Sequence, residues 1–131
     1  MGKQKLLRFK TADGDRLIRL DHIVECIPMV ELETGDADAS QQYRGLLHYR
    51  GCVLPVFEPA ATDRQRLDPS WFLIILDDDN HQIAVIARDI DDIESRPADC
   101  CRQLNIGGQR SVTVVSFDDD VVRVVEPQAL F

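Results

Sequence analysis

The chain has 131 residues, of which 44% are hydrophobic and 29% are charged, and its formal net charge is -8. That length suits one ordinary domain or two small lobes, and the mixture of apolar and charged residues is typical of a folded protein. The scattered Lys and Arg residues argue against a nucleic-acid partner, because phosphate binding requires a basic face. No stretch reaches the ~20 apolar residues of a membrane helix, and the N-terminus lacks the apolar region of a secretion signal. We therefore expect a cytoplasmic protein without direct membrane insertion.

Strand-turn-strand units rich in Val, Ile and Leu recur along the chain. In the first, Asp13-Gly14 provides the positive φ that a tight hairpin requires. The predicted strand pairs are residues 6–10 with 16–20, 44–49 with 52–57, 71–76 with 82–87, and 111–117 with 121–126. Hairpins at such similar spacing predict a closed or nearly closed all-β fold rather than an alternating α/β one.

Helix signals are sparse. Asp21 is a good N-cap residue and Pro28 prevents continuation, so the sequence predicts a short helix over residues 21–27. A second short helix is predicted over residues 97–104, because Pro97 suits a first helical turn and Gly107-Gly108 follows. Residues 33–42 are small, polar and without period, which indicates a loop.

A polar segment with two prolines, residues 59–70, separates the first two hairpins from the last two. It divides the chain into predicted lobes of about 1–62 and 63–131. Each lobe is too short to carry a reliable core of its own, so we expect one domain over 1–131 in which the lobes share a hydrophobic core, with exchange of strands between lobes allowed.

The chemistry of an enzyme or metal site is hard to find. Phosphate-binding glycine motifs are absent, and the three histidines have no close ligand pair. Residues 77–80 begin like a calcium loop, but Gln82 and Arg88 occupy the positions that require Gly and Glu. The sequence therefore predicts no catalytic residue, metal or cofactor.

The cysteines are best interpreted as reduced thiols. They lack a secretory context and a Cys-x-x-Cys spacing, and a vicinal pair is a poor disulfide framework. They are Cys26, Cys52, Cys100 and Cys101.

An Arg-Gly pair interrupts two apolar runs in residues 43–59, which read YRGLLHYRGCVLPVFEP. Gly51 provides a permissive backbone for a bend, and Arg50 projects from it. A charge held on a rigid turn is well placed for recognition. The alternative is that Arg50 pairs with a carboxylate such as Glu25 and contributes little beyond solubility. The residues alone favour neither reading.

The order of these segments resembles the CheW-like domain family of bacterial chemotaxis coupling proteins. Residues 43–59 are similar to the family signature Gly-Val-x-Asn-Leu-Arg-Gly-x-x-x-Pro-Val-x-Asp-Leu. The opening residues 6–27 resemble the family's strand-turn-strand with its Val-x-Glu-Val stretch. Residues 72–93 resemble its second-lobe hairpin, and residues 121–131 its last strand.

The resemblance implies a fold and a set of partners. The fold would be all-β: two small five-stranded β-barrel lobes sharing a hydrophobic core, with short helices. The function would be that of a non-enzymatic adaptor between the regulatory domain of a CheA-type histidine kinase and the cytoplasmic tip of methyl-accepting chemoreceptors. The receptor helix would lie in the groove between the lobes.

The resemblance also carries candidate partner-binding positions. Arg50 matches the signature arginine, and the remaining positions match turn glycines, the strand proline, the Val-x-Glu pair and the second-lobe hairpin. These remaining positions are Gly45 and Gly51, Pro55, Ile23 and Glu25, and Val85.

Several positions depart from the family pattern. His48-Tyr49 replaces Asn-Leu, and Glu58-Pro59 replaces Asp-Leu. Cys26 replaces the closing Val of the Val-x-Glu-Val stretch. Arg88 stands where the second-lobe hairpin usually has Asp, and the reversed charge would alter any salt bridge across that surface.

Two other functions remain open. One is a small-ligand-binding or catalytic β-barrel with a metabolite in the groove beside His48 and Glu58. The other is a CheW-like localisation partner that does not bind receptors.

Overall fold

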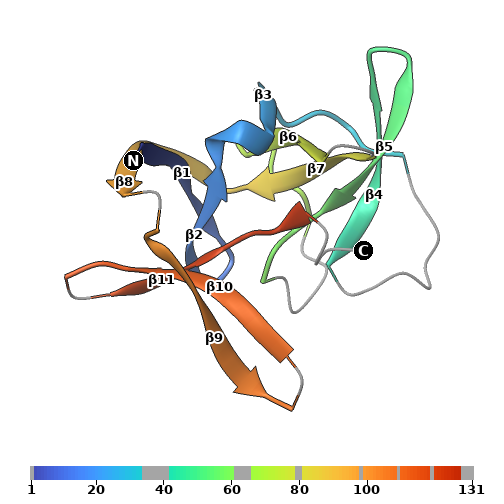
Figure 1. The fold of residues 1–131 in the computed structure, drawn as a ribbon. Coiled ribbons are helices and arrows are strands. Elements are labelled where there is room, and N and C mark those ends of the chain that lie inside the picture. Colours follow the sequence, from blue (N-terminus) through green and yellow to red (C-terminus); the bar gives the residue numbers. More distant parts are fainter. Residues whose placement is uncertain are drawn as a thin grey trace.

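Strands make up nearly all of the regular structure in the computed structural model (Figure 1). The structure describes residues 2–33, 42–60, 66–78, 81–97, 99–108, 110–118 and 120–127. Its elements are β1 (Lys3–Thr11), β2 (Gly14–Arg19), the 3-10 turn η1 (Leu20–His22), β3 (Ile23–Pro28), β4 (Tyr43–Tyr49), β5 (Cys52–Phe57), β6 (Phe72–Asp78), β7 (His81–Ala87), β8 (Asp89–Pro97), β9 (Cys101–Gly107), β10 (Arg110–Ser116) and β11 (Val121–Val124).

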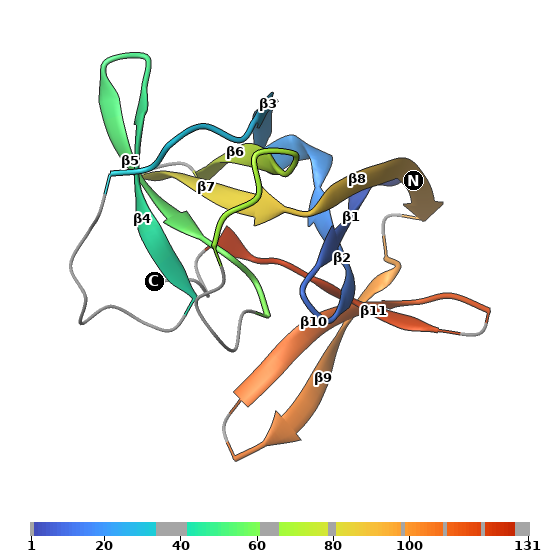
Figure 2. The same cartoon turned by 180° about the vertical axis from the view of Figure 1, so that it is seen from behind.

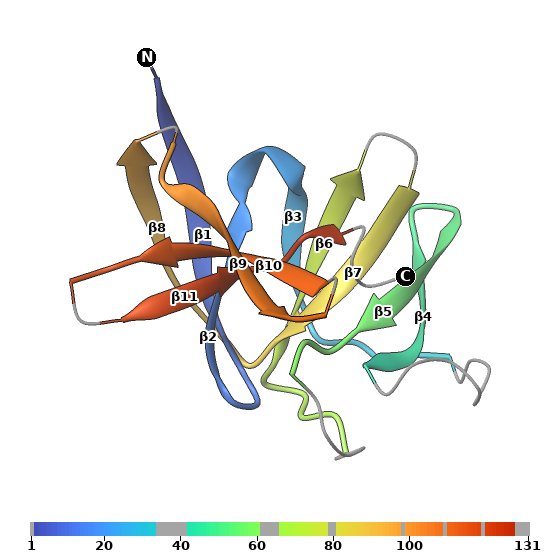
Figure 3. The same ribbon diagram turned by 60° about the horizontal axis from the view of Figure 1, so that its bottom comes forward.

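The strands form two sheets that lie side by side (Figure 3). The six-stranded sheet has the order β8-β1-β2-β11-β10-β9, and the five-stranded sheet has the order β3-β6-β7-β5-β4. Most pairs are antiparallel, but β11 pairs with β2 and β5 pairs with β7 in parallel. Each sheet therefore combines strands from both halves of the chain.

All four predicted hairpins are confirmed: β1 pairs with β2, β4 with β5, β6 with β7, and β10 with β11. In the second hairpin, Tyr49 lies opposite Cys52 across a two-residue turn. Arg50 has φ 48° and Gly51 has φ 79°. Positive φ at both central residues is the backbone geometry of a type I′ turn, whose twist matches that of the strands.

Both predicted helices are wrong. Within residues 21–27 the structure has only the end of η1, and β3 then pairs with β6 from Ile23 onward. Alternate residues of β3 are half-buried and exposed, which is a strand period. Asp21 lies inside the 3-10 turn, whose N-cap position is Arg19 without a side-chain hydrogen bond. Residues 97–104 run from the end of β8 into β9, which pairs with β10. In both places pairing with a distant strand overrides the local helix signal.

The all-β class is confirmed, but the sheets do not close into the two predicted barrels. Within the described ranges each sheet is open, with two edge strands, and one sheet has six strands rather than five. The edges of the five-stranded sheet still approach each other through an isolated bridge beyond β3. There the backbone groups of Glu33 and Leu46 exchange two hydrogen bonds of 2.9 Å. Among the residues that the structure describes, the chain after β3 thus joins β4 at this isolated bridge.

Gly45 makes this bridge possible. A Cβ atom at this position would lie 2.6 Å from the carbonyl oxygen of Glu33, and the residue has φ +137°. That backbone conformation is essentially restricted to glycine. Gly45 therefore allows close approach of the backbone segments that join the two edges of the sheet.

The predicted shared core is present between the two sheets. Nearly all buried residues of the largest cluster come from β1 and β2 on one side and from β5, β6 and β7 on the other, and Val125, just after β11, completes it. Among them are Leu7, Phe9, Ile18, Phe57, Ile74, Leu76 and Val85. A second cluster lies within the five-stranded sheet, and a third lies between β1, β2, β10 and β11. Most of the predicted loop at 33–42, and residues 61–65 of the predicted connection at 59–70, lie outside the described residues.

Candidate functional site

The β4–β5 hairpin projects from the five-stranded sheet, with its turn far from the β9–β10 hairpin (Figures 1 and 2). Arg50 lies in this turn, and 71% of its side chain is exposed. The β4–β5 ladder holds the turn in place from Tyr43 opposite Phe57 to Tyr49 opposite Cys52. The hairpin therefore presents a positive charge on an ordered support.

Glu25 connects this turn to the opposite edge of the sheet. Its Oε1 atom lies 3.1 Å from Nη2 of Arg50 and also accepts a hydrogen bond from the hydroxyl group of Tyr49. The guanidinium group of Arg50 lies 5.2 Å from the centre of the Tyr49 ring. The pairing of Arg50 with Glu25, which the residues alone left open as one alternative, is present, and Arg50 remains mostly exposed while it is paired.

The hydrogen bond to Glu25, followed by burial, raises the pKa of the Tyr49 hydroxyl above its ordinary value of 10.0, although the charge of Arg50 opposes this. A pKa that is raised in the folded state contributes stability below the unfolded value, and this stability is lost as the pH rises through the folded value. We expect stability to fall more steeply above pH 10.0 in the wild type than in Glu25→Gln.

Urea unfolding at neutral and strongly alkaline pH measures this difference. Both chains should carry Tyr43→Phe, so that Tyr49 is the one tyrosine of the two that titrates. If both chains lose the same free energy of unfolding between neutral and strongly alkaline pH, the Glu25 hydrogen bond has no such role.

The other predicted site residues do not all join this cluster. Gly51 is exposed beside Arg50, whereas Gly45 is buried. Pro55 is half-buried in β5, Ile23 packs partly buried against the shared core, and Val85 is fully buried within that core. The structure thus brings Glu25, Arg50 and Gly51 together and gives Gly45 and Val85 packing roles.

Exposed apolar side chains on β3 and β5 were not identified from the sequence. Val53 of β5 lies opposite His48 and is 51% exposed, and Val24 of β3 is also exposed beside Glu25. His48 forms an ion pair with Glu33 when it is protonated. The alternation of β3, had it been read as a strand, would have placed Val24 on the outer face.

Arg88 belongs to a charge cluster rather than to an open surface. Its Nη2 atom lies 3.1 Å from Oε2 of Glu58, and Nη1 of Arg44 lies 3.3 Å from Oε1 of the same carboxylate. Glu58 is only 1% exposed, and the guanidinium group of Arg88 stacks 4.6 Å from the Trp71 ring centre. Two departures from the family pattern, Glu58 and Arg88, thus meet inside the molecule.

Other kinds of site receive little support from the described residues. In that part of the chain, no group of three or more His, Cys, Asp or Glu side chains is placed to hold a metal ion. The four cysteines are free, and burial raises the pKa of the Cys26 and Cys100 thiols. No helix in the described ranges has the length and apolar character to cross a membrane.

Comparison with known proteins gives a consistent picture. The family model described as "CheW-like domain" matches residues 5–131. The crystal structure of the scaffolding protein TtCheW from Thermoanaerobacter tengcongensis is similar over 100% of this chain and 89% of that chain, with a TM-score of 0.80 and 13% sequence identity. At that identity the likeness shows the fold alone. The comparison with curated proteins gives no significant match.

Proposed function

The chain belongs to the CheW-like domain family, and from that premise we propose that it is a non-enzymatic adaptor of a chemotaxis-type signalling system. In this role it couples the cytoplasmic tips of chemoreceptors to the regulatory domain of a CheA-type histidine kinase. It acts in the cytoplasm, where receptor arrays at the membrane recruit it through protein contacts. The all-β scaffold and the similarity to a scaffolding protein support this proposal.

The observation that carries the proposal is the exposed Arg50 on the β4–β5 hairpin. Glu25 and Tyr49 hold its side chain in one place, which lowers the entropy lost when a partner binds. Arginine and tyrosine are both enriched at the energetic centres of protein interfaces.

Arg50→Glu is the sharpest test of this site. The substitution reverses the exposed charge and places two carboxylates together beside Glu25. We expect binding to a CheA-type regulatory domain or to a receptor-tip fragment to weaken by roughly 1–3 kcal/mol, the range for a lost charged contact. Calorimetric titration of the full chain with each fragment measures this change.

Controls separate the site from the function. Arg102→Glu makes the same charge change on β9, where Arg102 is exposed, and should leave binding unaltered if the site is correct. Arg50→Gln removes the charge without the repulsion from Glu25. Binding that ignores both Arg50 substitutions would move the site elsewhere, whereas no binding of the wild type to either partner would reject the adaptor function.

A further inference from the structure

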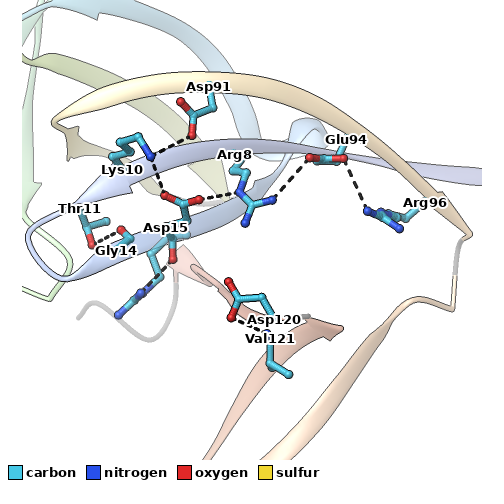
Figure 4. Close-up of polar contacts among 11 residues, drawn as sticks. Arg8, Lys10, Thr11, Gly14, Asp15, Asp91, Glu94, Arg96, Asp120 and Val121 are labelled. Atoms are coloured by element: carbon cyan, nitrogen blue, oxygen red, sulfur yellow. Dashed lines mark hydrogen bonds and ion pairs between the residues drawn. The ribbon is translucent and has the colours of Figure 1, made fainter. Parts of the chain in front are cut away.

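A partly open cavity of about 300 Å³ lies on the six-stranded sheet, far in sequence from the β4–β5 hairpin. It is lined by Arg8 of β1, Glu94 and Arg96 of β8, and Phe117, Asp118 and Asp120 between β10 and β11. Figure 4 shows Arg8, Glu94 and Arg96 in a row along β1 and β8, with Asp120 on the segment that leads into β11. This volume lies at the small end of the range for ligand sites.

Two guanidinium groups share one aromatic ring at this cavity. The central carbon of Arg8 lies 4.9 Å from the centre of the Phe117 ring, and that of Arg96 lies 4.2 Å away. Nε of Arg8 also donates a 2.8 Å hydrogen bond to Asp15. Because both cations are stacked, and one is anchored, they form a positive wall on the β1 and β8 side.

Glu94 pairs with both guanidinium groups of this wall but leaves part of their hydrogen-bonding capacity unused. Its two carboxylate oxygens lie 3.7 Å from Nη1 of Arg8 and from Nη2 of Arg96. These are ion pairs, but the distances exceed hydrogen-bond length. In addition, Nε of Arg96 is buried and has no hydrogen-bond partner among the described residues. A ligand oxygen would give Nη1 of Arg8 and Nη2 of Arg96 an acceptor at hydrogen-bond distance.

The opposite wall is acidic. Asp120 accepts a 2.8 Å hydrogen bond from the backbone N–H of Val121 through one oxygen, and Asp118 lies beside it in the lining. Counted with Glu94, three carboxylates outnumber two guanidinium groups. This balance opposes a multiply charged anion such as phosphate and favours a ligand that carries both signs of charge.

We propose that this cavity binds a small zwitterion, a molecule with one carboxylate and one ammonium group, as in a free amino acid. The carboxylate lies against Arg8 and Arg96, and the ammonium group lies against Asp118 and Asp120. The site shares no residue with the Arg50 cluster.

Titration of the isotope-labelled full chain, followed by NMR, tests this assignment. The probes are L-alanine, propionate, ethylammonium and inorganic phosphate; propionate lacks the ammonium group of alanine, and ethylammonium lacks its carboxylate. L-Alanine should shift the amide signals of Phe117 and Val121 in a saturable way. Propionate and ethylammonium should bind at least tenfold more weakly than L-alanine. Phosphate should cause no saturable shift of these signals.

Substitutions in the two walls should have different effects. Arg96→Gln should lower the affinity for alanine and the affinity for propionate by at least tenfold each. Asp118→Asn should lower the affinity for alanine to that for propionate and leave the affinity for propionate unchanged. Arg102→Gln on β9 is the matched control and should change neither affinity.

Three results would overturn the proposal. They are the absence of saturable shifts with alanine, equal affinity for alanine and propionate, and unchanged alanine binding by a folded Arg96→Gln chain. If Arg96→Gln does not fold, Arg96→Lys keeps the charge but loses the two-pronged donor group, and should still weaken alanine binding.

Discussion

Glu58→Gln is expected to lower the free energy of unfolding by about 3–5 kcal/mol, the range measured when one member of a buried ion pair is removed. The Glu58 carboxylate neutralises Arg44 and Arg88 at 3.3 and 3.1 Å. The amide group keeps the shape of the side chain but removes its charge. The side chain of Arg44, which is almost fully buried, then remains charged in a medium of low polarity.

Urea unfolding at neutral pH measures this loss, and Glu94→Gln is the matched control. Glu94 also lies between two arginines, but at 3.7 Å from each and with a more exposed side chain. Its substitution should cost less than about 1 kcal/mol, as is usual for exposed pairs. If the two variants lose similar stability, burial of Glu58 does not explain the contribution of its ion pairs to the free energy of unfolding.

The Glu58 cluster explains why this chain has Arg88 where the family pattern has aspartate. The chain crosses from the five-stranded to the six-stranded sheet at Arg88, whose backbone N–H donates a 2.8 Å hydrogen bond to the carbonyl oxygen of Lys10. An aspartate here, as in the family pattern, would place a second carboxylate beside Glu58. We therefore expect Arg88→Asp to destabilise the fold even though aspartate is the residue that the family pattern has there.

Gly45→Ala is expected to destabilise the protein by roughly 2–4 kcal/mol, which combines backbone strain with a steric clash. The added methyl group would meet the Glu33 carbonyl oxygen at 2.6 Å, and this oxygen accepts the 2.9 Å bond from the Leu46 N–H. Relief of the clash requires the bridge between the two edges of the sheet to open. Urea unfolding again provides the measurement.

Gly51→Ala separates the two causes. Gly51 also has a positive φ, +79°, but nothing lies within 4 Å of the position that its Cβ would take. Its substitution should cost about 1–2 kcal/mol from backbone strain alone. A loss at Gly45 no larger than that at Gly51 would show that the close approach to Glu33 contributes nothing.

The candidate site was partly predictable from the sequence. Arg50 and Gly51 could be placed at a bend, because the flanking apolar runs and the glycine are local signals. Glu25 was named as a partner only as one option among many carboxylates. Its position is decided by the strand β3, which was predicted as a helix, and by the curvature that brings β3 near β4.

The Glu58 cluster was beyond the reach of sequence reasoning. Glu58, Arg44 and Arg88 come from three separate segments, and each alone is typical of a solvated surface residue. The meeting of the buried Glu58 and Arg44 side chains with the half-buried Arg88 depends on where β4, β5, β7 and Trp71 pack.

Residue order alone is enough to specify the four hairpins, because a turn and the alternation of its flanking strands act over a few neighbouring residues. It also specifies the all-β class and the projecting Arg50. The parallel pairing of β11 with β2, the strands β3, β8 and β9, and the open edges come from contacts between residues far apart in the chain. Such contacts form where burial of the shared core outweighs local preference, and no single segment encodes that balance.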